Sequence, residues 1–525
     1  MHIVLNQIKK ISSHTYMMVL ILVIGICARG WLLGSVPGGI NQDEAFAGYE
    51  AYSLLHYGVD SSGYAFPVYL NTWGSGMNAL NTYLMIPFIA VFGLHSWVIR
   101  IPQFIVACFT LYITYKLLLK LFDQQMALLG LAFLVICPWH IMMSRWGLEA
   151  NLAPGFLLFG FYFFVLAAEK PKYFIVSALF YGFSLYCYAT IWPIVPLMIA
   201  LQLIYLLYTG KLHFNRYTVT ATFLLALLAL PLMLFLLVNY GYMQEIVTPF
   251  MSIPKLTMMR KNDISFSNMG ENLQRLVSVI LNQGDGLIWN ATEQFGLYYS
   301  KWFLVFGVIG FLYCCKRALI SVLKRTYDGA VLLLIPFVCA VLLGCVIEVN
   351  VNRINCIHLP IIIFISIGLC QTMQLMMRLA KKYSKYIPIL FACTGLFLFL
   401  RFERYYFSDY RQIIGSEFQE GLEDAVQYAL MLSDGEQDIF VDFQIYYPKV
   451  LFYSRLPVTE YRNTVQYVNY PSEFLLVGVC GSFHFGYSGT VTEQIGIIPS
   501  SFAETFLAEG WEVQQFGWAA VITRP

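Results

Sequence analysis

YMMVLILVIGICARGWLL (Tyr16–Leu33) leads into NQDEAFAGYEAY (Asn41–Tyr52), and the change between the two segments indicates the fold class. A helix that crosses a bilayer needs about 20 mostly apolar residues, and the first segment supplies nearly that many. In the second segment Phe46, Tyr49 and Tyr52 recur at helical spacing, which is typical of a helix lying along a membrane surface. We therefore expect a retained first spanning helix followed by a juxtamembrane helix.

The composition of the whole chain extends this interpretation. Of its 525 residues, 59% are hydrophobic and 12% are charged, whereas soluble domains carry about 25% charged residues. Most of the 12 cysteines lie inside apolar runs and none forms a CxxC pair, which indicates packing residues rather than disulfides or zinc ligands. The formal net charge of +2 gives no indication of a nucleic-acid partner.

The positions of lysine and arginine predict the membrane topology. We expect about 11 spanning helices, since each needs a long apolar run. They are predicted at 15–34, 99–119, 124–142, 152–168, 173–188, 191–209, 217–238, 301–315, 329–347, 354–376 and 386–401. Basic residues concentrate in short cytoplasmic loops. With Lys9 and Lys10 inside, every second loop is basic, so the N-terminus is expected in the cytoplasm and the C-terminus outside.

One apolar run decides whether this pattern holds. The segment MNALNTYLMIPFIAVFGL (Met77–Leu94) is nearly long enough to span a bilayer. If it did, every loop after it would change sides and the basic loops would lie outside, against the usual bias. We therefore expect a helix that lies in or dips into the outer interface, within the first external loop.

The polar end of the chain is predicted to form a small external α/β domain. The division we expect is a transmembrane region over residues 1–401 and the α/β domain over residues 402–525. Helices are predicted at Gly415–Gly435 and Tyr447–Pro457, and strands at Asp438–Phe443 and Glu473–Cys480.

Two groups of polar residues lie close to predicted membrane ends on the external side. Asp43 and Glu44 open the juxtamembrane helix, and Arg145, Glu149 and Asn151 lie in the short second external loop. Structural roles are the simplest alternatives. Acidic residues at a helix N-terminus cap the helix and complement its dipole, and an arginine with a glutamate can hold a loop together.

Further cations map to the same face. Asn352 and Arg353 lie in the turn before the predicted tenth span, where polar groups are costly and tend to mark function. A guanidinium there suits a phosphate, although an interfacial arginine that snorkels is the alternative. Lys255 and Arg260 in the large external loop and Arg100 at the start of the second span add positive charge.

Taken together, carboxylates and cations from distant parts of the chain are predicted to meet on one membrane face. A reaction that needs a general base and a stabilised phosphate leaving group requires this mixture. The sequence contains no Walker A, GxGxxG, HExxH or GxSxG motif, and its eight histidines are scattered, so nothing supports a histidine metal site.

The motifs resemble those of the glycosyltransferase superfamily C, in particular the protein O-mannosyltransferases, the aminoarabinose lipid A transferases and their bacterial relatives. The resemblance rests on the acidic pair after the first helix and on three further stretches. These are FGLHSWVIRIPQ (Phe92–Gln103), CPWHIMMSRWGLEANLAP (Cys137–Pro154) and VNRINCIHLP (Val351–Pro360). The likeness covers most of residues 1–400, and it does not extend to the C-terminal domain.

The resemblance implies a mechanism. The donor would be a monosaccharide on a polyprenyl phosphate, and the acceptor a hydroxyl of a cell-envelope glycan, lipid or protein at the outer face of a bacterial plasma membrane. Asp43 would be the general base, and Arg353 would balance the departing phosphate with help from Arg260 or Lys255. Glu149 and Glu44 would orient the acceptor or a cation. Relatives differ in metal dependence, and we expect none here, with a divalent cation as the alternative.

Three other functions fit a many-spanning protein. A transporter or lipid flippase usually has matching repeats or broken helices, which we do not find in the sequence. A polysaccharide polymerase or ligase would keep large external loops, but we would not expect its acidic pair directly after the first helix. An inert scaffold presenting the 402–525 domain would be unaffected by the substitution Asp43→Asn.

Overall fold

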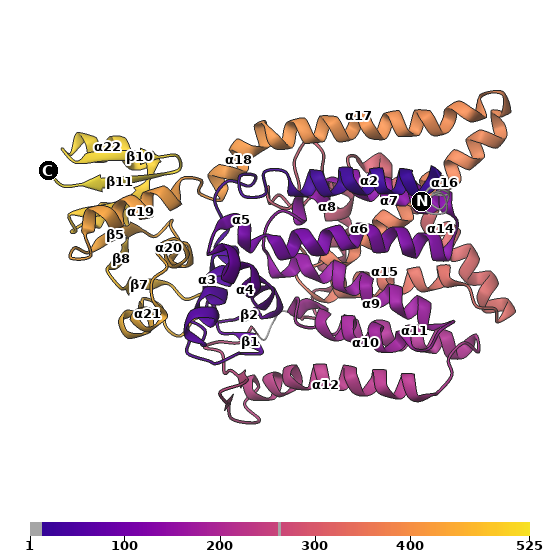
Figure 1. Cartoon of the computed structure of the whole chain (residues 1–525), viewed down its shortest axis with the longest axis horizontal. Coiled ribbons are helices and arrows are strands. Elements are labelled where there is room, and N and C mark those ends of the chain that lie inside the picture. Colours follow the sequence, from indigo (N-terminus) through magenta and orange to yellow (C-terminus); the bar gives the residue numbers. More distant parts are fainter. Residues whose placement is uncertain (1–12, 261–263) are drawn as a thin grey trace, which may run out of the picture.

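The computed structural model describes residues 13–260 and 264–525, and its larger part is a bundle of long helices (Figure 1). The helices along the bundle are α2 (Ser13–Gly30), α6 (Ile101–Leu121), α7 (Gln124–Ile136), α9 (Ala153–Ala167), α10 (Tyr173–Ser184), α11 (Ile194–Tyr208), α12 (Arg216–Asn239), α14 (Lys301–Lys324), α15 (Gly329–Val346), α16 (His358–Leu379) and α17 (Ile387–Phe407). Short helices and turns join them: α5 (Ser96–Ile99), α8 (Pro138–Met143), η1 (Glu149–Leu152), η2 (Ala189–Ile191), α13 (Met269–Asn282), η3 (Asn355–Ile357) and η4 (Lys381–Tyr386).

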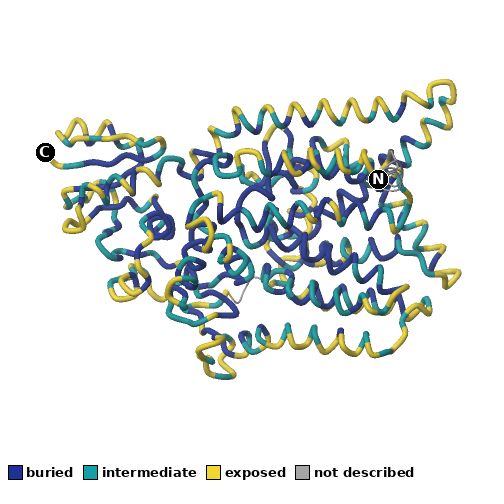
Figure 2. The backbone as a smooth tube through the Cα atoms, in the orientation of Figure 1, coloured by how far each residue is buried: buried dark blue, intermediate teal, exposed yellow. Residues whose placement is uncertain are grey.

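The bundle has the lengths and composition of a membrane domain. Within the described ranges, 8 helical segments are long and apolar enough to cross a bilayer. The helices α2, α7 and α10 are shorter but apolar, and each lies at the position of a predicted span. The outer helices α12 and α17 carry long exposed stretches (Figure 2), as expected of surfaces that face lipid. The chain is therefore a polytopic helical membrane protein, while the total of about 11 spans stays a prediction.

The two ends of the bundle differ in character. The loops after α6, α9, α11, α14 and α16, which carry the basic residues, lie at the same end as the start of α2 (Figure 1). The opposite end carries α3 (Gln42–Tyr57), α4 (Leu80–Phe92) and the C-terminal sheet. Lys9 and Lys10 lie outside the described residues, and which end faces the cytoplasm stays a prediction.

The two helices α3 and α4, which follow α2 in the chain, form a cap on this end. Helix α3 begins with a capping box, in which the Asn41 side chain accepts the Glu44 backbone N–H and the Glu44 side chain accepts the Asn41 N–H. Helix α4 has 13 residues, which at about 1.5 Å per residue reaches about 20 Å, too short for a bilayer core of about 30 Å. It lies beside α3 rather than along the bundle, as predicted (Figure 1).

The C-terminal region contains a seven-stranded sheet in the order β10-β11-β9-β5-β8-β7-β6. Strand β5 pairs in parallel with β8 and β9, and the other neighbours are antiparallel. The strands are β5 (Ile439–Asp442), β6 (Gln466–Tyr467), β7 (Val477–Cys480), β8 (Phe483–Gly486), β9 (Ile495–Pro499), β10 (Glu512–Phe516) and β11 (Ala519–Thr523). The helices are α18 (Asp409–Glu417), α19 (Leu422–Ser433), α20 (Tyr447–Ser454), α21 (Val458–Thr464) and α22 (Ala503–Ala508).

The prediction of one helix over 415–435 is wrong at its start. Gln419 and Gly421 have positive φ angles of 62° and 96°, so the chain leaves the helix between α18 and α19. A Cβ at position 421 would lie 2.0 Å from the carbonyl oxygen of Phe516, which explains why glycine is needed at this contact. The predicted domain boundary at residue 402 falls inside α17 and stays a prediction.

The cap and the C-terminal sheet share one hydrophobic core. Buried side chains of α3, α4 and the hairpin of β1 (Tyr69–Leu70) and β2 (Met77–Asn78) form a single cluster with side chains of α19, α20 and the sheet. Helix α20 packs directly on α3, where a Cβ on Gly48 would lie 2.6 Å from the Phe452 ring. Because the C-terminal region buries apolar surface against the first loop, it supports the residues at the start of α3.

Candidate active site

Asp43 lies in the first turn of α3, at the end of the bundle that the cap covers. Its backbone N–H donates to the Asn41 side chain, which fixes the start of the helix, and the residue as a whole is partly buried. Trp73 Nε1 donates to Asp43 Oδ1 over 3.0 Å. Burial raises the pKa of Asp43, Glu44 adds to the rise, and the Trp73 N–H and the Arg260 guanidinium oppose it. A carboxylate with a raised pKa beside a second carboxylate and a cation is suited to general-base chemistry.

The structure brings Glu149 and Arg260 to the same place. Glu149, in the turn η1, interacts electrostatically with both Asp43 and Arg260, and its Oε2 accepts the backbone N–H of Asn78. The side chain of Arg260 is exposed and also interacts with Asp43. Two carboxylates and one cation from three distant segments therefore surround one region, as the sequence predicts.

Glu44 has a different environment from its neighbour. Its carboxylate is fully buried and forms an ion pair with Arg100, at 2.9 Å from Arg100 Nε. It also accepts the backbone N–H groups of Gly147 at 2.5 Å and Asn41 at 3.0 Å. The other donors of Arg100 bond to the carbonyl oxygens of Leu33, Pro37 and Gly39. These contacts favour a positioning role for both residues rather than contact with substrate.

Arg145 is also fully buried and anchors the end of α2. Its guanidinium donates to the carbonyl oxygens of Ala28, Arg29, Trp31, Leu32 and Val36. The last carbonyl groups of a helix lack partners inside the helix, so this side chain supplies them. The rings of Tyr406 and Phe407 lie over the guanidinium at 5.5 and 5.0 Å. Its predicted role in substrate binding is therefore not the one that these contacts favour.

Asn151 and Asn355 join the loop between α8 and α9 to the turn before α16. Asn355 Nδ2 donates to Asn151 Oδ1 at 3.1 Å and to the Ala150 carbonyl at 3.2 Å, and its Oδ1 accepts from Trp139 Nε1 at 3.1 Å. All of these groups are buried. The two loops therefore form one rigid unit, which fixes the position of the neighbouring Arg353.

Arg353 lies at the edge of this unit and is partly accessible. Its Nη1 lies 3.3 Å from the exposed Glu348 carboxylate, and its backbone carbonyl accepts from Thr190 Oγ1. The loop containing Thr190 also reaches the cap, because the carbonyl of Tyr186 accepts the Leu80 N–H at the start of α4. Arg353 and the Asp43 region are thus linked through one loop at the same end of the bundle.

The two remaining predicted residues are polar groups on the same side. Asn352 is partly buried beside Arg353. Lys255 is exposed, and its backbone interacts with the Tyr64 hydroxyl in the cap. Among the residues that the structure describes, no group of three or more His, Cys, Asp or Glu side chains could hold a metal ion.

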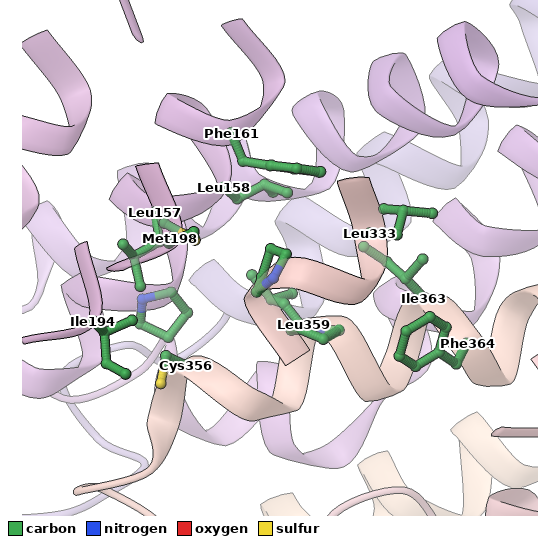
Figure 3. A pocket seen from close by; sticks show the side chains of 13 residues that line it. Leu157, Leu158, Phe161, Ile194, Met198, Leu333, Cys356, Leu359, Ile363 and Phe364 are labelled. Carbon is green, nitrogen blue, oxygen red and sulfur yellow. The ribbon is translucent and has the colours of Figure 1, made fainter. Parts of the chain in front are cut away.

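An apolar pocket opens within the bundle next to the turn that carries Arg353 (Figure 3). It lies between α9, α11, α15 and α16. Cys356 lines this pocket. It lies in η3, three residues after Arg353. The lining residues are Pro154, Leu157, Leu158, Phe161, Ile194, Met198, Leu333, Pro336, Cys356, Leu359, Pro360, Ile363 and Phe364.

Three residues of the site were not predicted from the sequence. Trp73 and Asn78 contact the two carboxylates Asp43 and Glu149, and Asn355 joins the loops. A tryptophan inside the glycine-rich turn NTWGSG (Asn71–Gly76) is the one signal that could have indicated the first of them.

Residues 80–238 match the family described as dolichyl-phosphate-mannose-protein mannosyltransferase. No curated protein sequence matches the chain significantly. The solved structure of ArnT from Cupriavidus metallidurans bound to undecaprenyl phosphate is similar, with a TM-score of 0.53 and 12% identity over 97% of each chain. The structure of its apo state is similar with a TM-score of 0.54 and 11% identity, over 97% of this chain and 98% of that chain. The archaeal oligosaccharyltransferase AglB from Archaeoglobus fulgidus, in complex with an inhibitory peptide and a dolichol-phosphate, has a TM-score of 0.49 and 12% identity. The match covers 84% of this chain and 63% of that chain.

Proposed function

We propose that this chain, a membrane protein of the glycosyltransferase superfamily C, transfers a monosaccharide from a polyprenyl-phosphate donor to an acceptor hydroxyl. The assignment to this superfamily rests on the match over residues 80–238 and on the fold shared with ArnT. The reaction would occur at the end of the bundle that carries α3 and the C-terminal sheet. This end would face outward from a bacterial plasma membrane, and the acceptor would be a glycan, lipid or protein of the cell envelope.

In the proposed reaction Asp43 takes the proton from the acceptor hydroxyl. The oxygen attacks the anomeric carbon as the bond from that carbon to the phosphate oxygen breaks, and polyprenyl phosphate leaves. Arg353 would balance its charge near the apolar pocket, and Arg260 is a cation that interacts with the base. A positioned base contributes about 10²–10⁴-fold, and preorganised charge at the leaving group adds a comparable factor.

The observation that carries the proposal is the apolar pocket lined by Cys356, three residues after Arg353. A lipid tail needs an apolar path inside the bundle, whereas its phosphate needs a cation in water-accessible surroundings. The pocket begins at Cys356 and runs between four helices, so a prenyl chain bound there would place its head group beside Arg353.

Substitution of a pocket residue should therefore separate tail binding from head-group binding. Met198 is buried and points into the pocket (Figure 3), so Met198→Trp should weaken binding of undecaprenyl phosphate about tenfold, because the added ring occupies the path of the tail. Binding of geranyl phosphate, whose tail is short, should change much less. Both affinities can be measured with purified protein in detergent.

The neighbouring Leu197 provides the matched control for this experiment. Its side chain is exposed on the outside of α11, so Leu197→Trp should leave both affinities unchanged. Equal effects of the two substitutions, or equal losses for the two lipids, would contradict a tail site in this pocket.

Arg353 should act on the donor and not on the acceptor. We expect Arg353→Ala to reduce kcat/KM for the polyprenyl-phosphate sugar about 10²-fold, because a charge-assisted contact with the phosphate is lost. Steady-state kinetics with varied donor and then varied acceptor would measure this. A variant impaired only toward the acceptor would show that Arg353 has another role.

A further inference from the structure

Trp73 occupies an unusual position at the tip of a short hairpin. The hairpin joins β1 (Tyr69–Leu70) to β2 (Met77–Asn78), and Trp73 is 5% exposed with a φ of +56°. A bulky residue with positive φ is uncommon and persists only when its surroundings hold it, often at functional sites. Its indole N–H donates to Asp43 Oδ1 at 3.0 Å.

The C-terminal region holds this indole in place. The ring stacks on Phe474 with a centroid distance of 4.3 Å and an interplanar angle of 11°. Tyr446 and Tyr447 contact it edge to face at 6.0 and 5.4 Å. The backbone N–H of Leu475 donates to the Trp73 carbonyl at 2.6 Å. The segment around residue 474 therefore contacts both the ring and the backbone of Trp73.

The next residue ties the hairpin tip to a third part of the site. Gly74 has a φ of +99°, and a Cβ there would lie 2.2 Å from the Ser472 carbonyl oxygen, so only glycine permits this close approach. Its carbonyl accepts the Met258 N–H at 2.9 Å, two residues before Arg260. The tip therefore connects the start of α3, the C-terminal region and the loop with the cation.

We propose that Trp73 is a positioning residue for Asp43 and that the C-terminal segment 472–475 completes the active site by holding it. The proposal rests on the proposed function, in which Asp43 is the base. The indole N–H fixes one carboxylate oxygen and stabilises the ionised form, in which a general base must be. The C-terminal region thus contributes to catalysis without itself touching the reacting atoms.

The direction in which loss of the Trp73 N–H changes the pKa of Asp43 follows from the groups around its carboxylate. Glu44 on α3 and Glu149 on η1 are the neighbouring carboxylates, and Arg260 is the neighbouring cation. A donor to the ionised carboxylate lowers its pKa, so removal of the Trp73 N–H should raise the pKa of Asp43 further. As the pH falls, the ionised carboxylate of Asp43, which is the form that can accept a proton, would then become protonated at a higher pH than in the unmodified protein.

Carbodiimide labelling of Asp43, which proceeds through the protonated carboxyl group, tests this without knowledge of the sugar or acceptor. The full-length protein would be labelled in detergent over a range of pH and the Asp43 peptide quantified by mass spectrometry. We expect Trp73→Phe to move the labelling midpoint upward by about one pH unit, a tenfold change in the ionisation constant. Phe474→Ala should move it in the same direction, and Phe474→Tyr, which keeps a ring to stack on, should restore it.

Trp511→Phe is the matched control, because Trp511 packs on Phe506 in another part of the C-terminal region. It should leave the midpoint unchanged. An unmoved midpoint in Trp73→Phe, or an equal movement in Trp511→Phe, would overturn the proposal. Retention of sugar transfer by Asp43→Asn would instead overturn the proposed function, so the two failures are distinguishable.

Discussion

Asp43→Asn should abolish sugar transfer, with a fall in kcat of about 10²–10⁴-fold. The amide occupies nearly the same volume and can still accept the Trp73 N–H, but it cannot take a proton from an acceptor hydroxyl at neutral pH. Release of undecaprenyl phosphate from undecaprenyl-phosphate sugars, in membranes that supply the natural acceptors, would measure the loss. Binding of undecaprenyl phosphate should be unchanged.

A loss of folding must be separated from this loss of chemistry. A carboxylate in the first turn of a helix stabilises it by about 0.3–1 kcal/mol, so the thermal midpoint of Asp43→Asn should fall only slightly. Asp409 also lies in the first turn of a helix, α18, and Asp409→Asn should leave transfer unaffected. Full activity of Asp43→Asn would remove the proposed base.

Arg100→Met should be the most destabilising of these substitutions, by about 3–5 kcal/mol. It leaves the Glu44 carboxylate buried without its cation and also removes donors to the carbonyl oxygens of Pro37 and Gly39. Thermal unfolding of the protein in detergent would measure the effect as a lower midpoint and a lower yield. The matched test is the double variant Arg100→Met with Glu44→Gln.

The double variant should recover part of the stability, because no uncompensated charge stays buried. Recovery should be incomplete, since the carbonyl groups at Pro37 and Gly39 still lack a donor. A single variant as stable as the unmodified protein would contradict the importance of the pair. So would a double variant no better than the single one.

Much of the membrane domain could be predicted, because the constraint that lipid imposes is strong and local. Apolar runs located the helices, and the basic loops grouped at one end of the bundle as the charge pattern predicts. The run Met77–Leu94 was assigned to the interface by the same pattern, and α4 lies beside α3 in the cap. Asp43 was also predicted at a helix start, because an acidic pair after a spanning helix is visible in the sequence.

The roles of the charged residues were harder to infer. Arg100 and Arg145 have the same sequence context as Arg353, namely an arginine at a predicted membrane end. Only the structure distinguishes them, because the first two are buried and donate to Glu44 and to the end of α2, while Arg353 is partly accessible. The partners of a guanidinium come from distant segments, since 56 residues separate Arg100 from Glu44 and 117 separate Arg145 from Ala28.

The contribution of the C-terminal region could not be predicted for a related reason. The strands β5 and β7 and the helix α20 were predicted from local patterns, but the other five strands were not, and the core of this region is shared with α3 and the β1–β2 hairpin. The stacking of Phe474 on Trp73 joins segments about 400 residues apart, which no local pattern indicates. This stacking joins the C-terminal region to the residue that donates to the proposed base.

The most direct measurement is the position of undecaprenyl phosphate in a cryo-electron microscopy map of the purified protein. We expect the tail of undecaprenyl phosphate between α9, α11, α15 and α16, with the phosphate beside Arg353 at the end of the bundle that carries Asp43. Density for the phosphate at the end formed by the basic loops, or a tail bound elsewhere with no path to Arg353, would contradict it.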